Sequence, residues 1–250
     1  MNKKVLVTGS TKGIGLEIAR KFSNSGWKVL TTSRNPVNVL NFKSEFASKE
    51  NIDYFKVDFR NNDEIDEFRK IIINLYETLD CLVINVGSGS GSVGIATDFE
   101  QNLQQIEDNF LTVYRTLKIL GSTICKNKNS RIISIGSVAG KVNVRAPFNY
   151  SSAKSAIVNL MKDYVCKLAQ DGISVNLINP GHTLTANGIW DKKSQGDPNE
   201  VQNILTKFVP LKRLGSGSDL AELVFLLTEY KSNYLNGAQI EIDGGLTISR

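Results

Sequence analysis

Apolar runs alternate with stretches in which apolar residues recur every three or four positions, from one end of the 250-residue chain to the other. The runs predict buried strands and the periodic stretches predict helices. The expected strands cover residues 5–8, 28–33, 53–57, 81–86, 131–135, 174–178 and 239–242. The expected helical faces cover residues 14–22, 65–75, about 99–126, 153–168 and 220–227.

Strands that alternate with helices along a whole chain indicate βαβ units and a parallel sheet. Connection and handedness rules then favour a doubly wound α/β fold: one Rossmann domain over residues 1–250, with a mostly seven-stranded parallel sheet and helices on both faces. No linker divides the chain. Residues 182–200 are polar and contain Gly188, Gly196 and Pro198, which predicts an irregular segment. We assign residues 182–210 as a substrate lid.

Composition narrows the class of protein. With 41% hydrophobic and 22% charged residues, the chain is typical of a soluble protein. No apolar stretch is long enough for a membrane span, and the first apolar run is too short for a signal peptide, so we expect a cytoplasmic protein with no membrane partner. The net charge of +5 is scattered among acidic residues, which argues against nucleic-acid binding. Cys81, Cys125 and Cys166 lie in apolar segments and are expected to be buried thiols.

A glycine-rich turn follows the first strand and opens the first helix, in the sequence Thr8-Gly9-Ser10-Thr11-Lys12-Gly13-Ile14-Gly15. Glycines there permit a tight turn and a close backbone approach to a pyrophosphate, which would meet the free N–H groups of the helix. The cofactor-binding candidates in this turn are Gly9, Thr11, Lys12, Gly13, Ile14 and Gly15.

The end of the second strand indicates which dinucleotide would bind. An NAD-binding sheet usually carries a carboxylate there, but this chain has Ser33 and Arg34. A guanidinium attracts a 2′-phosphate, and Lys12 adds a second positive charge. The pattern favours NADP(H) over NAD(H). The alternative is that Arg34 is an ordinary exposed side chain.

Ser137, Tyr150 and Lys154 are the candidate reacting groups. Tyr150 and Lys154 are four positions apart at the start of a helix and share one face. A nearby ammonium would lower the pKa of a phenol, which could then exchange a proton with a developing alkoxide. Ser137 follows a strand, and its hydroxyl could hold the substrate oxygen. The spacing alone is common, so Tyr150 as an ordinary helix-start aromatic remains an alternative.

The ordered set of motifs resembles the short-chain dehydrogenase/reductase family over nearly the whole length. It comprises the glycine turn, Asp58, Asn85-Val86-Gly87, Asn109, Ser137, Tyr150-x-x-x-Lys154, Asn179-Pro180-Gly181-x-x-x-Thr185 and Asp243-Gly244-Gly245. Two positions depart from the common family pattern: Val86 stands where many relatives have alanine, and Gly136 where many have serine.

The resemblance implies a role for each matching residue. Tyr150 would be the acid/base, with Lys154 binding the nicotinamide ribose, Ser137 orienting the carbonyl and Asn109 supporting a water-linked proton relay. Asp58 would contact the adenine. The remaining positions implied to contact the cofactor are Asn85, Gly87, Pro180, Gly181, Thr183 and Thr185. The resemblance also implies a homo-oligomer, a tetramer or a dimer.

The expected activity is NADPH-dependent reduction of a small-molecule carbonyl to an alcohol, or the reverse. A 3-oxoacyl thioester and a sugar or nucleotide-sugar carbonyl are both open as substrates, and a non-catalytic NADP(H)-binding regulator is the competing hypothesis. The only histidine, His182, makes a metal site improbable; it either lines the nicotinamide pocket or is structural. Trp190 would cover apolar substrate, while Lys192 and Lys193 read as solvated lid residues. The Gly/Ser-rich stretch 87–94 either shapes the substrate entrance or is an inert loop.

Overall fold

The computed structural model describes residues 3–35, 42, 46, 48–89, 98–121, 123, 125, 126 and 128–249. Seven parallel strands form one sheet in the order β3-β2-β1-β4-β5-β6-β9. The strands are β1 (Lys4–Val7), β2 (Lys28–Ser33), β3 (Ile52–Lys56), β4 (Cys81–Ile84), β5 (Arg131–Ile135), β6 (Ser174–Pro180) and β9 (Gln239–Ile242). The predicted doubly wound α/β fold is confirmed.

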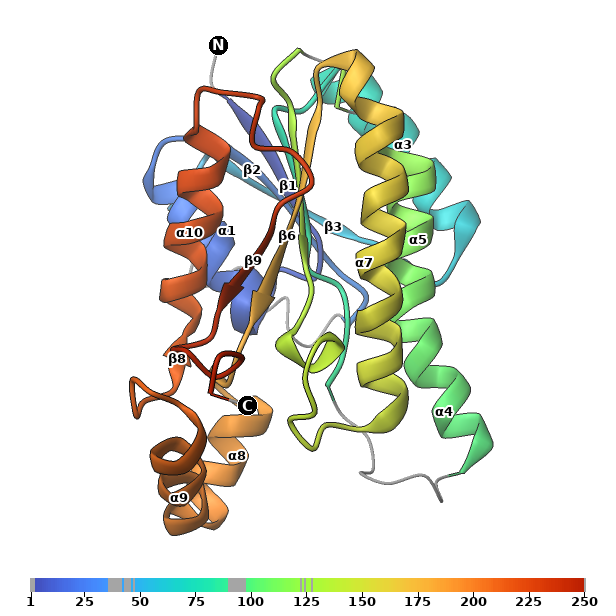
Figure 1. The fold of residues 1–250 in the computed structure, drawn as a ribbon. Helices are drawn as coiled ribbons and strands as arrows, with labels where there is room; N and C mark the ends of the chain where they lie inside the picture. The colour runs from blue at the N-terminus through green and yellow to red at the C-terminus, as the bar shows by residue number, and fades with distance from the viewer. Residues whose placement is uncertain are drawn as a thin grey trace.

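Helices cover both faces of this sheet (Figure 1). On one face lie α3 (Asn62–Tyr76), α4 (Phe99–Ile106), α5 (Thr112–Thr116) and α7 (Phe148–Leu168). On the other face α1 (Gly13–Asn24) packs against α10 (Gly217–Glu229). Each face buries its own apolar cluster, one around Leu82 and Ile157 and the other around Ile18 and Val83. Burial on both faces explains why the central strands read as continuous apolar runs.

The strand order reverses between β1 and β4. In open parallel sheets, ligands bind at the carboxyl ends of the strands beside such a reversal. The turn after β1, the ends of β2 and β4, and the start of α1 all meet at this edge. The topology therefore places the glycine turn and Arg34 at one site.

The helix expected over residues 99–126 is less regular than predicted. The backbone is helical over residues 99–121, but α4 and α5 are separated by a π-helical turn, η1 (Glu107–Leu111), and followed by a second, η2 (Leu117–Gly121). The expected end near Lys126 lies partly outside the described residues. A π-turn inserts a residue and re-aims the side chains around it. Both Asp108 and Asn109 belong to η1.

Three sequence expectations were wrong. The segment predicted to be irregular folds into β7 (Thr183–Leu184), α8 (Ile189–Gly196) and the start of α9 (Pro198–Phe208). Its residues are polar because both helices are largely exposed. Helix α9 begins at a proline and is capped by Asp197. β7 pairs with β8 (Gly215–Ser216) in a small second sheet.

The other two errors concern burial. Leu75 is 59% exposed because the next residue, Tyr76, takes the last core-facing position of α3 and bonds to Asp53. Cys166 is exposed because the core-facing stripe of α7 passes through Tyr164 and Leu168 instead. Cys81 and Cys125 are buried free thiols, as predicted.

Candidate active site

A cavity of about 230 Å³ opens at the carboxyl ends of β1, β2 and β4. It gathers backbone from the glycine turn, charged side chains after β2 and β3, and the segment that follows β4. Its lining residues are Gly9, Thr11, Lys12, Thr32, Ser33, Arg34, Asn35, Val57, Asp58, Phe59, Asn85, Val86, Gly87, Ser88, Asp108 and Thr112.

The glycine turn is held by contacts that side chains on its glycines would block. A Cβ on Gly15 would lie 2.5 Å from both the Gly9 carbonyl oxygen and Asn85 Nδ2. Asn85 Nδ2 donates to the carbonyl oxygens of Thr8 and Gly9, at 3.3 and 3.1 Å. Helix α1 starts at Gly13 without a side-chain cap and without an acidic residue in its first turn. Its N-terminal N–H groups suit an anion such as a pyrophosphate.

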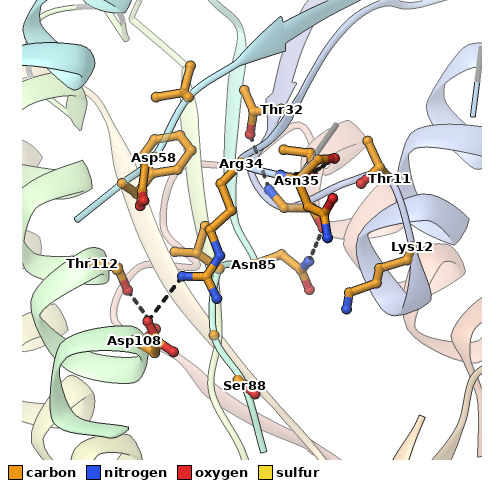
Figure 2. A pocket seen from close by; sticks show the side chains of 16 residues that line it. Thr11, Lys12, Thr32, Arg34, Asn35, Asp58, Asn85, Ser88, Asp108 and Thr112 are labelled. Atoms are coloured by element: carbon orange, nitrogen blue, oxygen red, sulfur yellow. Dashed lines mark hydrogen bonds and ion pairs between the residues drawn. The ribbon is translucent and has the colours of Figure 1, made fainter. Parts of the chain in front are cut away.

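Charged side chains enter the cavity from different walls (Figure 2). Arg34 reaches across, and its Nη1 lies 3.3 Å from Asp108 Oδ1. Lys12 points into the same space from the glycine turn. Asp58 is held by Arg60 through two bonds of 3.0 Å from Nε, and this guanidinium lowers the pKa of the Asp58 carboxyl.

The candidate reacting groups lie beyond the cavity lining, around Gly87. A Cβ on Gly87 would lie 2.8 Å from Asn109 Oδ1 and 3.4 Å from Lys154 Nζ. Lys154 is 5% exposed and donates from Nζ to the Ile135 carbonyl oxygen at 3.1 Å. Its Nζ is 5.8 Å from the centre of the Tyr150 ring. Strand ends and α7 thus bring Lys154, Tyr150 and Asn109 to one place.

Asn109 joins the π-turn to the segment after β4. Its Oδ1 accepts from the Ser88 backbone N–H at 2.9 Å, and its Nδ2 donates to the carbonyl oxygens of Ser88 and Gln105, at 2.9 and 3.0 Å. The side chain is fully buried. Asn109 therefore fixes the backbone on which Gly87 approaches Lys154.

The pKa values depart from the sequence expectation. Burial lowers the pKa of Lys154 to about 8. Burial raises the pKa of Tyr150 above its usual value, and a hydrogen bond with Ser137 only partly opposes this. The prediction that Lys154 lowers the tyrosine pKa is wrong for this structure. The ammonium is 5.8 Å from the ring centre and bonds to a carbonyl instead of the phenol, so desolvation dominates.

The segment expected near the nicotinamide lies against the glycine turn and the end of the chain. Thr185 Oγ1 would lie 3.8 Å from a Cβ on Gly13. Gly181 follows Pro180 and packs so closely on Asp243 that a Cβ there would lie 2.7 Å from the Asp243 Cα. Thr183 Oγ1 donates to the Gly181 carbonyl oxygen at 3.1 Å.

His182 and Trp190 contact each other instead of lining the main cavity. Their ring centroids are 4.1 Å apart, and His182 is only 8% exposed. His182 lines a second cavity of about 510 Å³ with Arg213 and Asp219, away from the glycine turn. Trp190 packs on the apolar cluster around Leu205, while Lys193 Nζ lies 5.0 Å from its ring centre. The structural interpretation of His182 fits these contacts better than a nicotinamide contact.

Only some of the residues predicted to form the site line this cavity. The predicted residues that line it are Gly9, Thr11, Lys12, Ser33, Arg34, Asp58, Asn85 and Gly87. The predicted residues outside its lining are Gly13, Ile14, Gly15, Asn109, Ser137, Tyr150, Lys154, Pro180, Gly181, Thr183 and Thr185. Of stretch 87–94, residues 90–94 lie outside the described part of the chain.

Sequence reasoning missed Thr32 and Asp108. Thr32 Oγ1 accepts the Gly9 N–H at 3.2 Å and so supports the glycine turn. A polar residue two positions before Arg34, at the end of an apolar strand, was the available signal for Thr32. Nothing in the sequence pairs Asp108 with Arg34, 74 positions away.

Two further features bear on the class of protein. Among the described residues, no three His, Cys, Asp or Glu side chains cluster as metal ligands would. None of the helices in the described ranges is both long and apolar enough to cross a membrane.

Comparison with known proteins gives consistent matches over the whole chain. The family model for short chain dehydrogenases matches residues 3–195. The 3-oxoacyl-[acyl-carrier-protein] reductase FabG of Buchnera aphidicola subsp. Schizaphis graminum is 31% identical over 248 residues, covering 98% of this chain and 97% of the relative. The FabG of Haemophilus influenzae is 29% identical and covers 99% of both chains. The solved structure of ElxO with NADP bound is 28% identical and superimposes with a TM-score of 0.90 over 100% of both chains.

Proposed function

Because the chain belongs to the short-chain dehydrogenase/reductase family of oxidoreductases, we propose that it uses NADPH to reduce a carbonyl compound to an alcohol. The observation that carries the proposal is the position of Tyr150 beside the buried ammonium of Lys154, whose Nζ lies 5.8 Å from the centre of the Tyr150 ring and donates to the Ile135 carbonyl oxygen. Gly87 lines the cavity and approaches Lys154, so these groups lie next to the cavity that we assign to the dinucleotide.

NADP(H) is the cofactor. The glycine turn fits a pyrophosphate because Gly15 has no room for a side chain and the start of α1 carries uncapped N–H groups. Arg34 and Lys12 both reach the cavity and would hold the 2′-phosphate, with Asp58 beside the adenine. Asn85 and Gly87 line the cavity between the end that would bind the 2′-phosphate and the end that would bind the nicotinamide. Pro180, Gly181, Thr183 and Thr185 would border the nicotinamide.

When bound, NADPH supplies the hydride that adds to the carbonyl carbon. Ser137 and Tyr150 donate hydrogen bonds to the substrate oxygen, and Tyr150 transfers its proton to that oxygen as negative charge develops. Lys154 would bind the nicotinamide ribose beside Tyr150 and supply the proton that restores the phenol. Asn109 supports this proton transfer because its hydrogen bonds to Ser88 hold the neighbouring Gly87 beside Lys154. In the reverse direction Tyr150 accepts the alcohol proton.

The substrate we propose is a 3-oxoacyl thioester, because the FabG relatives reduce 3-oxoacyl groups on a carrier protein by name and match this chain from end to end. Residues 182–210 act as the substrate lid. Helix α8 begins beside the reacting groups: a Cβ on Gly89 would lie 2.8 Å from Ile189 Cδ1 and 3.9 Å from the Tyr150 ring. Ile189 is 46% exposed and offers apolar surface to an acyl chain.

A homo-oligomer is part of the proposal. The outer side of α4 exposes Phe99 and Leu103, at 69% and 48%, and Phe148 at the start of α7 is 56% exposed. Helices α4 and α7 contact each other, and both carry exposed apolar side chains. Size measurement of the purified protein in solution tests this directly, and a monomer would contradict it.

The decisive experiment follows the absorbance of NADPH with a panel of carbonyl compounds, with NADH in parallel. The panel holds a 3-oxoacyl thioester, simple ketones and a sugar-derived ketone. We expect the fastest turnover with the thioester and with NADPH. Turnover only with the sugar ketone would replace the substrate assignment and leave the chemistry standing. Tight NADPH binding without any turnover would favour a cofactor-binding regulator instead.

A further inference from the structure

An ion pair between Arg34 and Asp108 joins two segments that line the proposed cofactor cavity (Figure 2). Arg34 stands at the end of β2, and Asp108 is on the π-turn η1, on the opposite wall. Both residues line the cavity. The pair therefore occupies space at the end of the site that we assign to the adenosine ribose.

Asp108 is held in this position. Its Oδ1 also accepts from Gln104 Nε2 at 3.0 Å, and its carbonyl oxygen accepts from Thr112 Oγ1 at 2.8 Å. Its side chain is only 16% exposed, whereas that of Arg34 is 49% exposed. Arg34 is thus the movable partner, and Asp108 is a fixed carboxylate.

The neighbouring carboxylate is already engaged. Asp58 lines the same cavity, but Arg60 holds both of its oxygens. Asp58 interacts with Arg34 only at longer range, whereas Asp108 forms the direct ion pair with it. A third cation, Lys12, faces the cavity from the glycine turn.

We propose that Asp108 is a specificity-determining residue that competes with the cofactor 2′-phosphate for Arg34 and so weakens the binding of NADP(H) relative to NAD(H). This inference rests on the proposed role of Arg34 as a 2′-phosphate ligand. The guanidinium has to leave the carboxylate, or share its donors, before it can bind a phosphate bidentately. The fixed negative charge of Asp108 also repels the phosphate.

The effect is confined to ligands that carry a 2′-phosphate. NADH has a hydroxyl there and needs nothing from Arg34. The pair is partly exposed, so its strength is modest and falls with salt. We expect Asp108→Asn to bind NADPH about three- to tenfold more tightly at low ionic strength, with NADH affinity unchanged.

The test measures dissociation constants of NADPH and NADH by fluorescence titration for the wild type, Asp108→Asn, Arg34→Ala and the double variant. Adenosine 2′,5′-bisphosphate and AMP serve as probes of the adenosine end alone. Glu107→Gln is the matched control. It removes one charge from the same π-turn, but Glu107 pairs with Arg115 and does not line the cavity. Thermal unfolding checks that each variant is folded.

Support requires tighter NADPH and bisphosphate binding in Asp108→Asn, no change in Glu107→Gln, and loss of the gain once Arg34 is alanine. Weaker or unchanged NADPH binding in Asp108→Asn overturns the inference, because Asp108 would then orient Arg34 or be neutral. An equal gain in the Arg34→Ala background also overturns it, since no competition for Arg34 would be involved. The assignment of Arg34 fails separately, if Arg34→Ala leaves the ratio of NADPH to NADH affinity unchanged.

Discussion

The two ends of the site are built from different kinds of groups. The end around Arg34, Asp108 and Asp58 consists of paired charges, and the Arg34 guanidinium is half exposed. At the other end, Lys154 and Asn109 are taken out of water, the lysine being only 5% exposed, and the partly buried Tyr150 lies beside them. Charges in water are screened and exchange partners easily, while a buried group is held by its surroundings.

The contrast explains which end can control which property. Recognition of a phosphate needs charges that attract it and can rearrange around it, which the exposed pairs allow. Proton transfer needs groups at fixed positions with shifted pKa values, which burial provides. Mutations at the buried end should therefore have large effects, and changes at the exposed end should have small, salt-dependent ones.

Replacing Tyr150, the proposed proton donor, should give the largest effect. Tyr150→Phe is expected to lower turnover by about 10²- to 10⁴-fold, because the proton donor is lost, while NADPH affinity stays nearly unchanged. Steady-state rates and fluorescence titration give the two quantities. Tyr164→Phe is the matched control, since Tyr164 lies in the core on the same helix. Full activity in Tyr150→Phe would end the assignment of this residue as the acid.

The buried ammonium should destabilise the folded protein near neutral pH. The pKa of Lys154 is lowered from 10.5 to about 8, so the folded state disfavours its charged form. Lys154→Met should stabilise the protein at pH 7 by up to about 3 kcal/mol. The advantage should shrink as pH rises from about 8 towards 10.5, because the wild-type lysine becomes neutral in the folded state and its penalty disappears.

Denaturant unfolding of the cofactor-free protein at pH 7 and pH 10 measures this change. Lys162→Met is the control, because Lys162 is exposed on the same helix. A stability difference between Lys154→Met and the wild type that does not depend on pH would contradict the assigned pKa shift.

A side chain on Gly87 should disturb the junction between the two ends. Gly87→Ala places a Cβ 2.8 Å from Asn109 Oδ1, on a backbone with a φ of +150°. We expect a loss of about 1–3 kcal/mol in the free energy of unfolding and a lower turnover, since Asn109 and Lys154 must shift. Gly196→Ala is the control because nothing lies within 4 Å of its added Cβ. Equal behaviour of the two variants would mean that the contact around Gly87 is not tight.

Salt should give the smallest effect and act on the exposed end. Raising ionic strength from low to above physiological should weaken NADPH binding about threefold more than NADH binding, because the 2′-phosphate is held by screened charges. Paired titrations of the wild type across a salt series measure it. Parallel salt dependence of the two cofactors would show that the phosphate contacts are not exposed ion pairs.

The sequence predicted most of the fold because apolar periodicity follows directly from which residues are buried. The ranges of β2, β5 and β9 match their predictions residue for residue. Residues 182–200 were mispredicted as irregular because the helices there, α8 and α9, bury few residues, only Val201 and Leu205 in α9, so the periodic signal is weak. The π-turns leave no mark in hydrophobic periodicity, so the helix over residues 99–121 was predicted as regular.

Local motifs in the sequence predicted the chemistry that we propose: a glycine turn that admits phosphates, an arginine at the position where a carboxylate would repel the 2′-phosphate of NADP(H), and a tyrosine four positions from a lysine. Each motif consists of residues that are near one another in sequence, so the sequence by itself was enough to recognise it. Tertiary structure alone decided the pKa of Tyr150, the position of His182 against Trp190, and the pairing of Arg34 with Asp108. Burial and long-range contact set these properties, and both arise only when distant segments of the chain pack together.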